Sequence, residues 1–212
     1  PVIAAAVRGD AALPGDMPPT TPSKHPLAPP QSSGERVTWQ LTGSYLGPAF
    51  SGGAWQQSAP KPTVEGCLQA ALLPLLDGRS ELRLSCAGRT DAGVSALAQL
   101  VSFHSWPQLQ EREVAEAIQD AAPAPGALRL VRARRMEGSY HATYSTAWRR
   151  YAYLLPPTAA ATHETAAAEA AALDALLRPL VAAGPRDYAA LGRGVPAGKD
   201  TTMALTHASA RP

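Results

Sequence analysis

An aspartate flanked by two glycines and preceded by an arginine is the arrangement in this sequence best suited to chemistry. Gly88, Arg89, Asp91 and Gly93 lie within Ala87–Val94. The glycines permit backbone angles closed to other residues and let another molecule approach the main chain. Arg89 can hold the Asp91 carboxylate ionised, or bind a phosphate through its planar guanidinium. A tight turn whose Asp only caps its own backbone would use the same residues, so the short pattern leaves both interpretations open.

Strand-like runs flank this loop, so the acid would be displayed where a strand ends. They extend from Glu81 to Cys86 and from Ser95 to Ser105. Rigid elements of this kind can aim a loop residue, and binding or catalytic residues are often found on such loops. The surrounding elements follow the order β-α-β-β-α-β. Strands are expected at Val37–Tyr45, around Leu82 and Leu84, at Leu97–Phe103 and at Ala127–Arg134, with helices at Thr63–Leu76 and Glu111–Ala121.

This order predicts an α/β (α+β) fold, the ferredoxin-like split βαβ unit, over residues 36–137. Many RNA-binding modules and enzymes share that architecture, so it assigns no function by itself. Residues 1–35 carry eight prolines and little periodic hydrophobicity. They are expected to form a disordered or processed tail.

Residues 138–212 would begin a second, similar domain. A strand is expected at Thr146–Leu155, followed by an alanine-rich helix from about Glu164 that Pro179 kinks or ends. Nothing after Gly184 supplies the strands that a second core needs. We therefore interpret the chain as a piece of a longer product, truncated within its second domain.

Composition excludes several classes of protein. At 212 residues and 45% hydrophobic, the chain can bury a sizeable core. No apolar run is long enough to span a bilayer, which argues for a soluble intracellular protein and against a membrane partner. The five histidines show no ligand spacing, so no metal is assigned. Cys67 and Cys86 are far apart in sequence and are expected to be reduced and buried.

Basic residues concentrate in one stretch, although the formal net charge is only +2. Six arginines lie between Arg129 and Arg150 against the single acid Glu137, and aromatic residues are interleaved with them. Arginines neutralise backbone phosphates, and aromatic rings offer stacking faces to unpaired bases. A solvent-exposed edge strand whose charged side chains prevent pairing with another chain would show the same pattern. The pattern favours nucleic acid over that alternative.

Longer strings carry a family resemblance. Gly88–Val94 reads Gly-Arg-Thr-Asp-Ala-Gly-Val, which closely resembles the catalytic loop of the tRNA pseudouridine synthase A family. Tyr140–Tyr153 is similar to a family motif of the form Phe-His-Ala-Arg-Phe-Ser-Ala-x-x-Arg-Arg-Tyr-x-Tyr. Phe50–Gly52, Trp55–Gln57 and Thr63–Gly66 echo its opening segment. The motifs occur in the order of the family, over roughly residues 37–212.

The resemblance implies a role for each of several residues. Asp91 would be the catalytic carboxylate that converts uridine to pseudouridine in tRNA. The residues expected to bind the substrate are Arg89, Tyr151, Arg149, Arg150 and His141, with Tyr151 stacked on the uracil. The family implies no cofactor, a preference for the anticodon stem-loop, and a homodimer for the full-length form.

The chain departs from the family pattern at several positions. Leu46 replaces an acid after the first strand, Ser95 replaces a histidine after the Gly-Val pair, and Thr143 replaces the arginine of the His-Ala-Arg triplet. The family's later arginine-containing motif has no counterpart before Pro212.

We therefore expect an isomerase that acts on tRNA, in the nucleus, the cytoplasm or an organelle. A non-catalytic RNA-binding remnant of the same fold is the alternative. A hydrolase with Asp91 as its nucleophile is a third reading, but no histidine or second acid is placed as an obvious partner.

Overall fold

The computed structural model describes residues 2–5, 36–76, 82–106, 109–155, 162–192 and 194–212. Contacts between residues divide the chain into two compact units, Pro1–Leu154 and Leu155–Pro212. Each unit is described by itself below.

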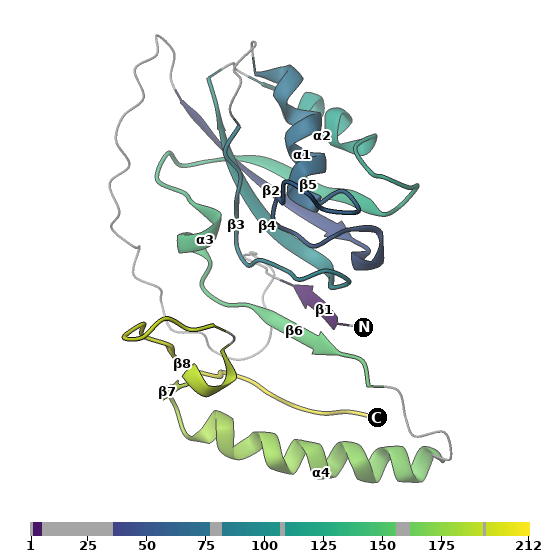
Figure 1. The fold of residues 1–212 in the computed structure, drawn as a ribbon, viewed down its shortest axis with the longest axis vertical. Coiled ribbons are helices and arrows are strands. Elements are labelled where there is room, and N and C mark those ends of the chain that lie inside the picture. The colour runs from purple at the N-terminus through teal and green to yellow at the C-terminus, as the bar shows by residue number, and fades with distance from the viewer. Residues whose placement is uncertain (1, 6–35, 77–81, 107–108, 156–161, 193) are drawn as a thin grey trace. The chain divides into compact units, whose positions relative to one another are not determined.

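The first unit contains the expected ferredoxin-like arrangement (Figure 1). Its four strands pair antiparallel in the order β5-β2-β4, with β3 added to β4. The prediction of an α/β fold with the order β-α-β-β-α-β is confirmed. The strands are β2 (Val37–Tyr45), β3 (Ser85–Cys86), β4 (Ser95–Ser105) and β5 (Leu128–Met136), and the helices are α1 (Val64–Leu72) and α2 (Glu111–Gln119).

Local capping explains where both helices begin. The Thr63 hydroxyl accepts a hydrogen bond of 3.1 Å from the backbone N–H of Gly66, which satisfies a free donor in the first turn of α1. At the start of α2, the Glu113 carboxylate accepts from the backbone N–H of Gln110 at 2.6 Å. Short 3-10 turns at Gly47–Ala49 and Leu73–Leu75 follow β2 and α1.

The apolar core lies between α1, α2 and one face of the sheet. Trp39 of β2 and Phe103 of β4 face each other in the strand register and stack with ring centroids 6.1 Å apart. The Trp39 indole N–H donates to the Ser105 hydroxyl at 2.9 Å, so the buried ring leaves no polar atom unpaired. The helices cover these rings with buried apolar side chains, among them Leu68, Leu72, Val114 and Ile118.

The opposite face of the sheet is polar and is covered by the segment that follows β5. The Gln40 amide donates to the Tyr140 hydroxyl at 2.6 Å, and the backbone N–H of Ala142 donates to the Ser102 hydroxyl at 2.9 Å. All four of these residues are buried. Helix α3 (Ala142–Ser145), which the sequence pattern did not predict, continues this cover.

These contacts explain why the first unit extends further than the pattern suggested. We expected its end at residue 137, but the contacts place the boundary after Leu154. The hydrophobic periodicity of β5 stops at Met136, whereas polar hydrogen bonds hold the following segment to the sheet. Periodicity does not report such bonds.

Two more strands widen the sheet of the first unit. Strand β1 (Val2–Ala5) pairs parallel with the start of β4 and antiparallel with β6 (Arg150–Tyr153). Residues 2–5 lie within the segment expected to be a tail, and four residues are too few to show a periodic signal. The rest of that expected tail lies outside the described residues. Strand β6 is shorter than the predicted Thr146–Leu155 and belongs to the first unit.

The second unit is built around one long helix, α4 (His163–Ala182). The Thr162 hydroxyl caps it by accepting from the backbone N–H of Thr165, and the helix runs past Pro179 instead of ending there. Strands β7 (Arg186–Asp187) and β8 (Thr202–Met203) form a short antiparallel pair, with a 3-10 turn at Ala189–Leu191 between them.

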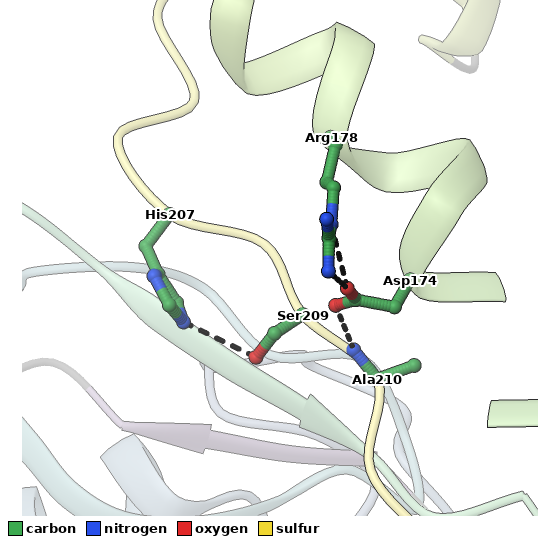
Figure 2. Close-up of polar contacts among 5 residues, drawn as sticks. All are labelled: Asp174, Arg178, His207, Ser209 and Ala210. Atoms are coloured by element: carbon green, nitrogen blue, oxygen red, sulfur yellow. Dashed lines mark hydrogen bonds and ion pairs between the residues drawn. The ribbon is translucent and has the colours of Figure 1, made fainter. Parts of the chain in front are cut away.

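Polar contacts hold the last residues of the second unit to α4 (Figure 2). Asp174 forms an ion pair of 2.9 Å with Arg178, one turn further along the helix, and accepts a hydrogen bond of 3.2 Å from the backbone N–H of Ala210. These bonds hold the pKa of Asp174 below its usual value. No side chain of α4 is buried. No helix in the described part of the chain is long and apolar enough to cross a membrane.

Truncation of two leucines of the first unit should have very different effects on its stability, because one lies in the core and the other is exposed. Leu72 is fully buried, so Leu72→Ala should lower the free energy of unfolding by about 2–5 kcal/mol through lost burial and a residual cavity. Leu97 is 63% exposed, so Leu97→Ala should change it by no more than about 0.5 kcal/mol. Urea titration of both variants measures the difference, and equal losses would contradict this core.

Candidate active site

The Ala87–Val94 loop joins β3 to β4 through a tight turn. The backbone N–H of Val94 donates to the Asp91 carbonyl at 3.1 Å. Gly93 occupies the third position of this turn with a φ of 83°. A glycine adopts that left-handed angle without steric cost, whereas a Cβ would strain it.

The loop is anchored at Thr90, the residue before the candidate carboxylate. The hydroxyls of Tyr45 and Thr90 share a hydrogen bond of 2.6 Å, and the backbone N–H of Gly53 donates to the Thr90 carbonyl at 2.9 Å. Burial raises the pKa of Tyr45, so its hydroxyl stays protonated. A Cβ at Gly53 would lie 2.6 Å from the Thr90 hydroxyl oxygen, so only glycine permits this approach.

Helix α1 holds the glycine segment in place. The first backbone N–H groups of α1, those of Val64 and Glu65, donate to the carbonyls of Gly52 and Gly53 at 3.2 and 2.9 Å. These donors have no partner inside the helix, so the segment satisfies them. The N-terminus of α1 therefore fixes Gly53, and Gly53 fixes Thr90.

A second glycine contact secures the far end of the loop. A Cβ at Gly47 would lie 2.3 Å from the carbonyl carbon of Val94, so the two backbones touch. The backbone N–H of Gly47 donates to the Ser95 hydroxyl at 2.9 Å. Ser95, one of the departures from the family pattern, thus has a structural partner.

The near end of the loop is held through two carbonyls. The buried Gln99 amide donates to the Gly88 carbonyl at 2.5 Å, and the Arg149 Nε–H donates to the Ala87 carbonyl at 2.6 Å. Tyr151 also reaches this point, because its hydroxyl lies 3.7 Å from where a Cβ on Gly88 would stand. The structure therefore brings Tyr151 and Arg149 to the loop that carries Asp91.

The side chains of Arg89 and Asp91 are not among these anchors. Both residues are exposed, and among the described residues neither side chain forms a hydrogen bond or an ion pair. The interaction between them that the sequence suggested is therefore not made. A rigid loop instead presents a carboxylate and a guanidinium to an approaching molecule.

His141 occupies a different position. Its Nε2 hydrogen-bonds the Ser85 hydroxyl at 3.0 Å, and its ring lies 4.6 Å from that of Tyr144. Burial lowers the pKa of His141, which favours the neutral ring. These partners, Ser85 and Tyr144, lie outside the Ala87–Val94 loop. The neighbouring Thr143, which stands where the family motif has arginine, donates to the Cys86 carbonyl at 2.8 Å.

Comparison with known proteins gives a consistent result. No protein-family model matches the chain. A tRNA pseudouridine synthase A from Photorhabdus laumondii is 34% identical over 101 residues, covering 48% of this chain and 37% of that protein. Proteins of the same name from Oceanobacillus iheyensis and Bordetella parapertussis are 32% and 35% identical over 116 and 113 residues. Over these residues the chain is similar to tRNA pseudouridine synthase A.

The relationship covers only part of those proteins. This chain spans 37–44% of the length of the curated relatives that it matches. The similarity covers 48–55% of the chain itself.

The arginine-rich stretch is divided between the two edges of the sheet. Strands β5 and β6 lie at opposite ends of the order β5-β2-β4-β1-β6, roughly 19 Å apart at the usual strand spacing. Arg134 donates to Gln40 at 2.8 Å, and Arg135 donates to the Leu109 carbonyl at 2.5 Å. Arg150 of β6 is exposed. Sheet pairing thus separates arginines that are neighbours in sequence.

A small cavity of about 20 Å³ lies behind the loop, lined by Tyr45, Leu68, Cys86, Gly88 and Gln99 among others. That is room for about one water molecule, so the cavity cannot enclose a nucleobase. A substrate would meet the exposed side of the loop. The sequence pattern missed Tyr45 and Gln99 as supports of the site. In the sequence, Tyr45 and Gln99 stand out only as polar residues within predicted strands. Their role becomes clear once the position of the loop that they bond is known.

Protonation of a second histidine should weaken the fold. Burial, and secondarily the nearby Arg36 and His141, lower the pKa of His104 to about 4 from its usual 6.5. The unfolded chain therefore binds a proton more readily between these values, so the free energy of unfolding falls as the pH falls from 6.5 to about 4. Urea midpoints of the wild type and His104→Gln across this range measure the effect. Identical pH dependence in the two proteins would contradict it.

Proposed function

We propose that this chain forms part of a tRNA pseudouridine synthase in which Asp91 is the catalytic carboxylate. The observation that carries the proposal is the geometry of the loop: Thr90 is held from two sides, while the Asp91 side chain stays exposed. The relatives are named for this activity. A catalytic group held in a fixed position saves the entropy of orienting it during the reaction.

A single ionised carboxylate at the sugar–base junction suffices for this reaction. The N1–C1′ bond of uridine breaks, the base turns, and a C5–C1′ bond forms. The proton on C5 leaves to water, and N1 takes up a proton. Asp91 would act either as a nucleophile toward the sugar or base, or as a base that abstracts a sugar proton.

The uridine must first leave its stack, which costs a few kcal/mol and least in a loop. This cost supports a substrate in the anticodon stem-loop. Arg89 would bind the phosphate or ribose of the turned-out nucleotide. Tyr151, which is 50% exposed beside Gly88, would stack on the uracil. Arg150 would contact a backbone phosphate. His141, which bonds Ser85 at the start of β3, would contact the bound RNA there.

Removal of the Asp91 charge should abolish the reaction. Asp91→Asn keeps the size of an exposed side chain, so the fold should persist while the rate of pseudouridine formation falls at least about 1,000-fold. The release of tritium from tRNA labelled at uridine C5 measures the lost C5 proton directly. Asp120→Asn, an exposed acid at the end of α2, is the matched control and should keep full activity.

Three outcomes of this experiment are informative. Substantial tritium release by Asp91→Asn would refute the assignment. Tight tRNA binding by the wild type without tritium release would support the non-catalytic RNA-binding alternative. Release of free uracil would instead indicate a hydrolase.

The exposed arginine of β6 should contribute to tRNA affinity. If Arg150 contacts a phosphate, Arg150→Ala should weaken binding and make the slope of log affinity against log salt shallower by about 0.7–0.9. Arg112→Ala is the control, because Arg112 pairs with Glu116 on the surface of α2. An unchanged slope for Arg150→Ala would mean that Arg150 is only a solvated surface residue.

A further inference from the structure

Two distant parts of the chain meet at Ala87 and Gly88, and Ala87 lies 62 residues from its partner Arg149. A Cβ on Gly88 would stand 3.2 Å from Arg149 Nε, 3.4 Å from Arg149 Cδ and 3.7 Å from the Tyr151 hydroxyl. The loop and the entry to β6 therefore touch at a point where the chain carries no side chain. The bond from Arg149 Nε to the Ala87 carbonyl, at 2.6 Å, lies directly beside this contact.

The geometry of this bond limits what Arg149 can do. A guanidinium is planar, so a short hydrogen bond from Nε restricts the orientation of the whole group. The Nε–H donor of Arg149 is therefore occupied by a backbone carbonyl of the loop. Arg150, the next residue, forms no side-chain hydrogen bond or ion pair within the described part of the chain. Both arginines are exposed, but only Arg149 is bonded to the loop.

Gln99 makes a second contact with the loop backbone. Its amide donates to the Gly88 carbonyl, so two consecutive peptide units of the loop are held by two long-range side chains. Gln99 is buried within β4 and fixes the loop to the sheet. Arg149 instead fixes the loop to the segment that carries Tyr151.

We propose that Arg149 is a positioning residue that fastens the entry of β6 to the Ala87–Gly88 backbone and thereby holds Tyr151 beside the loop that carries Asp91. This inference rests on the proposed function, because the pairing of Tyr151 with Asp91 matters only if both meet the same nucleotide. It gives Arg149 a different role from the substrate binding that the sequence suggested. Of these two adjacent arginines, Arg150 then serves the phosphate contact.

Arg149→Lys tests the role, because it keeps the charge and removes the directed bond. A methylene of lysine stands where arginine has Nε, so an apolar group would face the Ala87 carbonyl. We expect kcat for pseudouridine formation to fall about 10- to 100-fold, the loss typical of a displaced reacting group. The salt slope of tRNA binding should stay at the wild-type value, since the charge remains.

Gly88→Ala tests the same contact from the loop and leaves Arg149 in place. The added methyl group would press on the guanidinium at 3.2 Å and force a shift of a few tenths of an ångström, so a smaller loss of kcat is expected. The double variant should be no slower than Arg149→Lys alone, because both changes break one contact. Gly138→Ala is the control, since a Cβ there meets nothing within 4 Å.

Hydrogen exchange gives a readout that does not depend on activity. Arg149→Lys should speed exchange in both Ala87–Val94 and Arg150–Tyr153, whereas Gly138→Ala should change neither. If the wild type forms no pseudouridine but this coupled exchange appears, the proposed function fails and the fastening contact stands. In an active wild type, an unchanged kcat in Arg149→Lys overturns the positioning role. Unchanged exchange in both segments also overturns it, as does a multiplicative loss in the double variant.

Discussion

The hydrogen bond between the Tyr45 and Thr90 hydroxyls is the interaction on which the candidate site depends. It joins the end of β2 to the residue before Asp91. The N-terminus of α1 reinforces it through the Gly52–Gly53 carbonyls, and Gly53 in turn binds Thr90. A carboxylate carried by an otherwise exposed turn is thereby attached to the most regular elements of the fold. This is how a loop residue can be both rigid and accessible.

Glycine has a second role here besides backbone freedom. Gly47, Gly53 and Gly88 each stand where a Cβ would collide with or press on another segment. The three contacts bring the loop against the end of β2, the start of α1 and the entry to β6. Gly52 and Gly93 in addition adopt positive φ angles of 108° and 83°. Close backbone approach and positive φ angles together explain the glycines of the site.

The polar face of the sheet shows how a unit can extend beyond its hydrophobic pattern. Gln40, Ser102 and Tyr140 are buried, and each forms a hydrogen bond that removes the cost of burial. These bonds hold the chain after β5 against the sheet and lead it toward β6. The pKa of His104 is low because the same face excludes water. Stability at mildly acidic pH and the placement of Tyr151 therefore depend on one surface.

The sequence by itself determined the order of the elements, the helices α1 and α2, and the position of the Asp91 loop between two strands. These features are local: they follow from periodicity, capping residues and turn glycines. Only the tertiary structure decided that the arginines of β5 and β6 lie at opposite edges, that the first unit continues to Leu154, and that Val2–Ala5 joins the sheet. It also decided that Arg149 turns toward Ala87, although Arg149 and Arg150 look equivalent in sequence. Strand pairing and side-chain bonds between distant residues set these features. A local sequence pattern does not show which distant residues will meet.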